Sequence, residues 1–298
     1  KSVLGHVMEQ KGDNIASNPV SARRLSSADS FGFIQRMTDL VQPVAGRIVV
    51  RVAQFSGDPS GVVTKKVIAE LDRFRDVNVR PMGQSLDINV ANDIRREFAR
   101  AAKLARNWLR ERQADILVWG HVPSPGATMH IHFISRAQWD ERVPGSFDLT
   151  TDLPLPVDLD DASADLLHAA TLSATVLANK EKAQIRRSAL GAASFPLESA
   201  MDNIPKAMTQ RERTALYLCY GNILSSTWVL TRAPELFEKA VSAYREVTST
   251  AEIDEPSLDW ATAHKHLSSL MFLRADSEKD LAGYEDSAAS ALSALELF

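Results

Sequence analysis

The hydrophobic pattern of residues 46–157 alternates between two periods. Short runs rich in β-branched and aromatic residues are typical of buried strands, and the segments between them have helical spacing. This order predicts a mixed sheet of four or five strands with two helices, because parallel neighbours need a crossover connection. The expected strands are Arg47–Phe55, Val77–Met82, Asp115–His121, Met129–Ser135 and Phe147–Leu155, and the expected helices are Val62–Phe74 and Ala91–Arg112.

Residues 158–298 contain no strand-like run and repeat a helical spacing instead. Helical segments in succession predict antiparallel hairpins, the unit of an α-solenoid. Residues 1–45 have a mixed character and are expected to form an arm or a peripheral element with a short helix over Phe31–Leu40. The expected C-terminal helices are Ala162–Leu190, Pro196–Ala207, Gln210–Val229, Pro234–Thr248, Leu258–Leu273 and Glu278–Leu297.

Composition narrows the function classes. Of the 298 residues, 45% are hydrophobic and 24% are charged, which excludes wholesale disorder and a multi-span membrane protein. The net charge of −4 lacks the excess of positive charge that is typical of nucleic-acid-binding proteins, so no nucleic-acid partner is expected. The single cysteine, Cys219, excludes an intrachain disulfide, and its helical neighbours predict a buried thiol. No catalytic or nucleotide-binding motif is present, so neither an enzyme activity nor a cofactor is expected.

The helix expected at 91–112 carries a basic stripe. From 93 to 112 there are seven basic and three acidic residues, which gives a local charge of +4. A solvated outer face is the simpler interpretation, and an anionic partner such as lipid headgroups is the functional one. The residues of this stripe are Arg96, Arg100, Lys103 and Arg110.

Two smaller features carry candidate chemistry. The turn Gly57–Gly61 lies between a strand and a helix, where backbone N–H groups can hold an anion. It lacks the P-loop motif, and the simpler interpretation is a tight turn capped by Ser60 or Asp58. His130 and His132 share one face of a strand near His121 and could in principle hold zinc, but exposed sheet histidines are the better expectation.

Two pairs of segments in the helical part share a pattern. ELFEKAVSAYREV and YEDSAASALSALEL each have a small residue, a larger one four positions later and an apolar one seven positions later. EPSLDWATAHKHLSSLMFLRAD and RERTALYLCYGNILSSTW contribute first helices, and the whole resembles degenerate tetratricopeptide (TPR) repeats. Ser268 and Trp228 replace the usual small glycine, and the interval from Ala240 to Ala288 is 48 residues rather than about 34. The matched residues are Ala240, Tyr244 and Val247 with Ala288, Leu292 and Leu295, and Pro256, Leu258, Asp259, Trp260, Ala261, Leu267 and Leu270.

The middle part contains VVRVAQFSGDPSG, the helix IAELDRF, and ADILVWGHV followed by a polar hairpin and MHIHFIS. These segments resemble the TolB N-terminal-like α/β module of bacterial envelope proteins. Together with the TPR-like segments they are similar to a class of bacterial proteins in which a membrane anchor precedes such a module. The resemblance divides the chain into 1–45, 46–157 and 158–298. It implies a bacterial protein held at a membrane by a segment absent from this chain, which begins at Lys1 rather than Met.

These features favour a non-enzymatic scaffold or adaptor that binds a protein partner on its helical array. The inner wall of a solenoid is the usual partner surface, and we expect Tyr217, Asn222 and Lys265 to contact the partner there. The alternative is a ligand sensor that binds a small anion at Gly57–Gly61. Self-association through the C-terminal helix pair is also expected, because the chain ends at Phe298 within its last helix, without the polar cap that solenoids usually need. Leu281, Ala288, Leu292 and Leu295 lie on one stripe of that helix.

Overall fold

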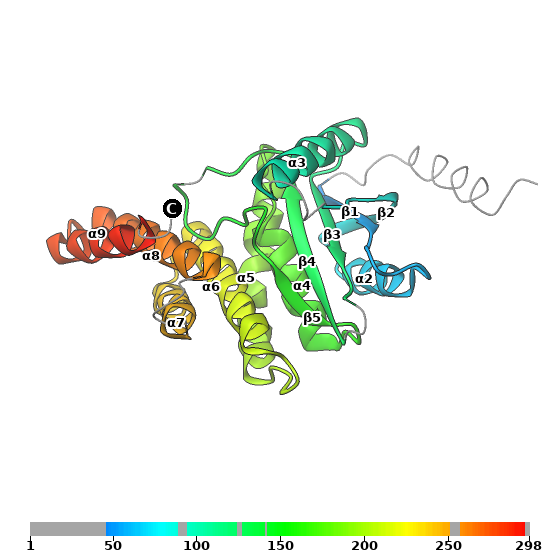
Figure 1. Ribbon diagram of the computed structural model, residues 1–298. Helices are drawn as coiled ribbons and strands as arrows, with labels where there is room; N and C mark the ends of the chain where they lie inside the picture. The colour runs from blue at the N-terminus through cyan, green and yellow to red at the C-terminus, as the bar shows by residue number, and fades with distance from the viewer. Residues whose placement is uncertain (1–45, 89–93, 124–126, 141, 251–256, 296–298) are drawn as a thin grey trace, which may run out of the picture.

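A mixed five-stranded sheet in the order β2-β1-β3-β4-β5 forms the N-terminal half (Figure 1). β1 is parallel to β2 and β3, whereas β3 pairs with β4 and β4 with β5 in antiparallel fashion. The mixed five-stranded sheet is therefore confirmed. The strands are β1 (Ile48–Gln54), β2 (Val77–Ser85), β3 (Ile116–His121), β4 (Thr128–Ser135) and β5 (Leu153–Pro156). The computed structural model describes residues 46–88, 94–123, 127–140, 142–250 and 257–295, so the expected arm at 1–45, with its short helix, lies outside the described residues.

Helices cover both faces of this sheet. α2 (Val62–Asp72) and α4 (Asp161–Ser173) lie on one face, and α3 (Ile94–Glu111) lies on the other (Figure 1). Neighbouring residues of β1 point to opposite faces, so Val50 packs with α2 and α4 while Val49 packs with α3. The sheet therefore has one more covering helix than the two that the sequence predicted.

The single helix expected over Ala162–Leu190 is wrong, because the chain breaks between α4 and α5 (Lys180–Asp202). Asn179 begins α5 as its N-cap, and its side chain accepts a hydrogen bond from the backbone N–H of Lys182. The helix then continues through Pro196, so the separate short helix expected from that proline is also wrong.

The C-terminal half continues as two helical hairpins, α6 with α7 and α8 with α9 (Figure 1). The turns of the two hairpins match. Arg232 ends α6 and Lys279 ends α8, both in the left-handed conformation with φ of 61° and 58°. Their backbone N–H groups donate to the carbonyls of Trp228 and Ala275, so the two caps are related by 47 positions (232 to 279). The helices are α6 (Gln210–Thr231), α7 (Pro234–Thr250), α8 (Leu258–Glu278) and α9 (Leu281–Leu295).

The same offset of 47 positions corrects the expected register of α9. Ala240 and Val247 of α7 are buried, and their equivalents on α9 are the buried Ser287 and Ala294. The 48-residue match made Ala288, Leu292 and Leu295 the buried set, which is wrong by one position. Rotation by one residue turns the expected stripe outward, so Leu281, Leu292 and Leu295 are 79%, 67% and 68% exposed.

The segment before β5 packs along α6 and joins the two halves. The Cys219 thiol is fully buried, as predicted, and donates a hydrogen bond to the backbone carbonyl of Asp152 at 3.2 Å. The hydroxyl of Ser226 donates to the carbonyl of Gly145 at 3.1 Å. A side chain at Gly145 would overlap α6, because its Cβ would lie 2.5 Å from the carbonyl oxygen of Asn222. The sheet and α4 to α8 therefore share a continuous hydrophobic core.

Candidate functional site

A groove with a volume of about 330 Å³ lies between α5, α6 and α7. Its aromatic part comes from α6, where Tyr217 and Tyr220 are three residues apart and so point to the same side of the helix. The flanking helices place charged side chains around these rings. These are Glu198 and Asp202 from α5, and Lys239 and Glu246 from α7.

Tyr220 is the buried polar group of this groove. The residue is 8% exposed, and its hydroxyl makes no hydrogen bond to any residue of the described ranges. Burial raises the pKa of this phenol to about 12, with a further contribution from the negative charges of Glu198 and Asp202. The hydroxyl is therefore a neutral donor at physiological pH, and its oxygen keeps access to solvent at the groove.

The charges around the tyrosines are not balanced. The Lys239 ammonium is paired with the Glu198 carboxylate across the groove. Asp202 and Glu246 are exposed on opposite walls, and neither forms an ion pair with another described residue. The groove therefore combines an aromatic floor with two carboxylates that form no ion pair with another described residue.

A second groove, of about 270 Å³, lies between α7, α8 and α9. It also combines an aromatic ring with carboxylates, but an arginine of the chain occupies it. The guanidinium of Arg274 lies over the ring of Phe237, 4.3 Å from its centroid. The Arg274 Nη1 also donates to Glu238 Oε1 at 2.6 Å, and its Nε lies 3.2 Å from Glu278 Oε1. The aromatic ring and the carboxylates of this groove already hold a cation of the chain itself.

The three residues expected to contact a partner do not form one surface. Tyr217 is half-buried and lines the groove between α5, α6 and α7. Asn222 is fully buried: its Nδ2 donates to the Ser146 carbonyl at 3.3 Å, and its Oδ1 accepts from the Tyr244 hydroxyl at 2.9 Å. Its expected role in partner binding is therefore wrong, because both of its polar atoms are committed inside the core.

Lys265 is half-buried on α8 and is not among the residues that line either groove. The sequence analysis also missed Tyr220. The signal for it was present, because Tyr217 and Tyr220 have the spacing of side chains on one face of a helix. Its burial and its open hydroxyl depend on α5 and α7, whose placement the sequence does not give.

The turn Gly57–Gly61 is closed by its own aspartate. Asp58 is 5% exposed, and its Oδ1 accepts from the Val62 N–H and its Oδ2 from the Thr64 N–H, at 3.1 and 2.9 Å. The hydroxyls of Ser60 and Thr64 donate to the same carboxylate. The N-cap position is Gly61 and carries no side-chain cap, so Asp58 accepts the hydrogen bonds of the first turn from three positions before it. The N-terminus of α2 has no room for an external anion while this carboxylate occupies it.

The histidines of β3 and β4 are brought together, as their alternation predicted. His121 stacks on His130 with ring centroids 4.8 Å apart, and His130 Nδ1 lies 2.7 Å from Asp152 Oδ2. That hydrogen bond raises the pKa of His130, whereas burial lowers the pKa of His132. The expectation of exposed histidines is wrong for His132, which is buried beside the Thr151 carbonyl at 3.0 Å. Within the described ranges, no group of three His, Cys, Asp or Glu side chains is placed to hold a metal ion.

A half-buried carboxylate lies near the start of α8. Asp259 forms no hydrogen bond or ion pair with another residue of the part that the structure describes. Burial raises its pKa to about 6, and the negative charges of Asp152 and Asp148 raise it further against the opposing effect of Arg211. The ionised form of this group is therefore disfavoured by the fold.

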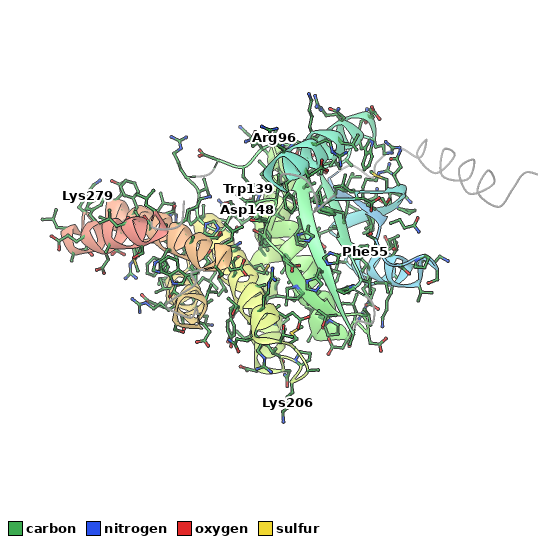
Figure 2. All side chains as sticks on the ribbon, in the orientation of Figure 1. Phe55, Arg96, Trp139, Asp148, Lys206 and Lys279 are labelled. Carbon is green, nitrogen blue, oxygen red and sulfur yellow. The ribbon has the colours of Figure 1, made fainter. Side chains whose placement is uncertain are left out.

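The basic stripe of α3 lies on the surface, as predicted. Its four residues, Arg96, Arg100, Lys103 and Arg110, are exposed, and Arg96 lies at the outside of the molecule (Figure 2). Arg100 forms an ion pair with Glu97 at 2.8 Å. An anionic partner for this surface stays a prediction. None of the helices in the described ranges combines the length and the apolar character needed to cross a bilayer.

No model of a known protein family matches the chain, and neither a curated protein nor a solved structure matches it. The resemblance to TolB N-terminal-like modules and TPR repeats thus stays a prediction.

Proposed function

We propose that the chain is a non-enzymatic scaffold or adaptor that binds a protein partner through its helical half. The observation that carries this proposal is the groove between α5, α6 and α7, whose aromatic floor includes the Tyr220 phenol, which forms no hydrogen bond with another described residue. Grooves between packed helices are a common way to hold a peptide segment, with apolar anchors for affinity and polar groups for orientation.

The hairpin architecture supports a TPR-like array. Arg232 and Lys279 close two hairpins with the same left-handed cap, and small or short side chains follow at equivalent positions of α7 and α9. Arrays of this kind present grooves between successive hairpins to extended partners. The outward leucines of α9 are the surface that the predicted self-association would use.

The alternative, a sensor for a small anion, has less support. Its expected site is the turn Gly57–Gly61, where the Asp58 carboxylate already accepts the hydrogen bonds that an anion would need. The membrane attachment implied by the resemblance concerns a segment outside this chain and stays a prediction.

Site-specific photo-crosslinking in a bacterial lysate tests the adaptor function. A photoreactive amino acid replaces Ser242, an exposed residue of α7 that lines the groove. The matched control carries it at Glu235, an exposed residue in the first turn of the same helix outside that groove. We expect a discrete protein adduct at 242 that is absent at 235. Adducts of equal yield at both positions, or at neither, would contradict the proposal.

A further inference from the structure

The chain repeatedly places arginine over an aromatic ring. Arg274 covers Phe237 and is held by Glu238, and Arg232 covers Trp228 at 4.6 Å. A guanidinium is planar and weakly hydrated, so it stacks on a ring while its N–H groups donate to carboxylates at the edge. The groove between α7, α8 and α9 is a complete example of this arrangement.

The groove between α5, α6 and α7 has the same aromatic and acidic components, but no arginine of the described residues lies over its rings. Tyr217 and Tyr220 provide the rings, and Asp202 and Glu246 provide carboxylates on opposite walls. The one cation that lines this groove, Lys239, is engaged by Glu198. An incoming cation would thus meet negative charge, an aromatic surface and a free hydroxyl at the same place.

We propose that the partner presents a basic segment to this groove, with an arginine side chain packed against Tyr217 and Tyr220. The guanidinium pairs with Asp202 and Glu246, as Arg274 pairs with Glu238 in the other groove. Arginine fits better than lysine because its fork can donate to two carboxylates at once. This inference rests on the proposed adaptor function and adds the chemical class of the partner segment.

Fluorine NMR of the full chain tests this inference directly. The protein has four tyrosines, so 3-fluorotyrosine labelling gives four probes, of which Tyr217 and Tyr220 lie in the groove. Tyr244 is buried in the core and Tyr284 belongs to α9, so they serve as internal controls. Single Tyr→Phe variants assign the resonances.

The ligand is a ten-residue glycine-serine peptide with two arginines, and the matched peptide carries two citrullines, which keep the shape but not the charge. We expect the arginine peptide to shift the resonances of Tyr217 and Tyr220 and leave that of Tyr284 unchanged. The citrulline peptide should bind at least about tenfold more weakly, because the charge-assisted hydrogen bonds are lost. The double variant Asp202→Asn with Glu246→Gln should weaken arginine-peptide binding by a similar factor.

The variant Glu238→Gln is the control, since it removes a carboxylate of the other groove, and it should leave this binding unchanged. Equal binding of the arginine and citrulline peptides, or binding that the double variant does not weaken, would overturn the inference. If a cross-link still forms at position 242 in that case, the adaptor function stands and only the basic partner is excluded. If neither peptide shifts the groove tyrosines and no cross-link forms, both proposals fail.

Discussion

The two halves of the molecule differ in how some of their carboxylates are held: by hydrogen bonds and ion pairs in the sheet half, and without them in the helical half. In the sheet half, Asp58 and Asp115 are surrounded by donors, so each carboxylate is neutralised by hydrogen bonds or ion pairs. In the helical half, the carboxylates of Asp202, Glu246 and Asp259 form no hydrogen bond or ion pair with another described residue. Buried polar atoms without a hydrogen-bond partner occur in both halves, among them Trp119 Nε1 in β3 and His266 Nε2 in α8, so burial alone does not separate the halves. The contrast concerns these carboxylates: those of the sheet half are held by donors of the chain, and those of the helical half are open to a cation.

The largest expected effect comes from removing the Asp115 carboxylate, which is buried and paired in the sheet half. Asp115 accepts from the Val49 N–H at 2.8 Å and pairs with Lys182 of α5 at 2.5 Å, while its side chain is 2% exposed. Asp115→Ala leaves a largely buried ammonium without its anion and should lower the free energy of unfolding by about 3–5 kcal/mol. Urea denaturation measures the loss.

Arg136→Ala is the control for this variant, because Arg136 touches the same carboxylate at 3.4 Å from a side chain that is 41% exposed. Its effect should stay below about 1 kcal/mol. Equal losses for both variants would mean that the sheet half does not depend on the buried pair. The contrast between the two halves would then be wrong.

The next effect has the opposite sign and belongs to the helical half. Asp259 has a raised pKa of about 6, so its carboxylate destabilises the fold once it ionises. Stability should fall as pH rises from about 4 through 6, because the folded state binds more protons than the unfolded state in that window. Asp259→Asn should abolish this slope and raise the free energy of unfolding at pH 7 by about 2 kcal/mol.

Thermal unfolding of both proteins between pH 3.5 and 7.5 checks this expectation. Stability curves that stay parallel across the window would show that Asp259 finds a partner in solution. In that case the helical half would be as closed as the sheet half around this residue.

The first four strands could be predicted because their signals are local, whereas β5 covers only Leu153–Pro156 and not the expected Phe147–Leu155. Alternating β-branched residues in β1 decide which side chains enter each core, and Asp58 precedes α2 at a spacing from which it can cap the helix. The split between α4 and α5 was missed because helical spacing continues across it. The cap at Asn179 that marks the break is a weak signal among many polar residues.

The register of α9 and the groove could not be read from the sequence for a related reason. Alanine, serine and leucine alternate so closely in α9 that an offset of 47 or 48 residues matches the repeat equally well. Packing decides between them, because Ser287 donates a hydrogen bond to the Ser268 carbonyl at 2.9 Å and so faces α8. The open state of Tyr220 depends likewise on contacts between helices distant in sequence, and periodicity carries no information about these.

The smallest expected effect comes from removing the Asp58 carboxylate, which leaves N–H groups at the start of α2 without their acceptor. Asp58→Ala removes the acceptor of the Val62 and Thr64 N–H groups and should lower the free energy of unfolding by about 1 kcal/mol at pH 7. Burial opposes ionisation of Asp58, but the hydrogen bonds from Thr64 and Ser60 outweigh it and lower its pKa. The stability it contributes is therefore present above pH 4 and is lost as pH falls below that value, where the two proteins should converge.

Phosphate then tests whether Asp58 is what prevents an anion from binding at the start of α2. In the Asp58→Ala variant the freed N–H groups at the start of α2 can donate to an anion, so 50 mM phosphate should restore part of the lost stability. Chloride at the same ionic strength serves as the control for screening, and the unchanged protein should respond equally to both salts. If phosphate stabilises the unchanged protein more than chloride does, an anion binds despite Asp58. The turn Gly57–Gly61 would then bind an anion in the unchanged protein, and this result would support the anion-sensor alternative.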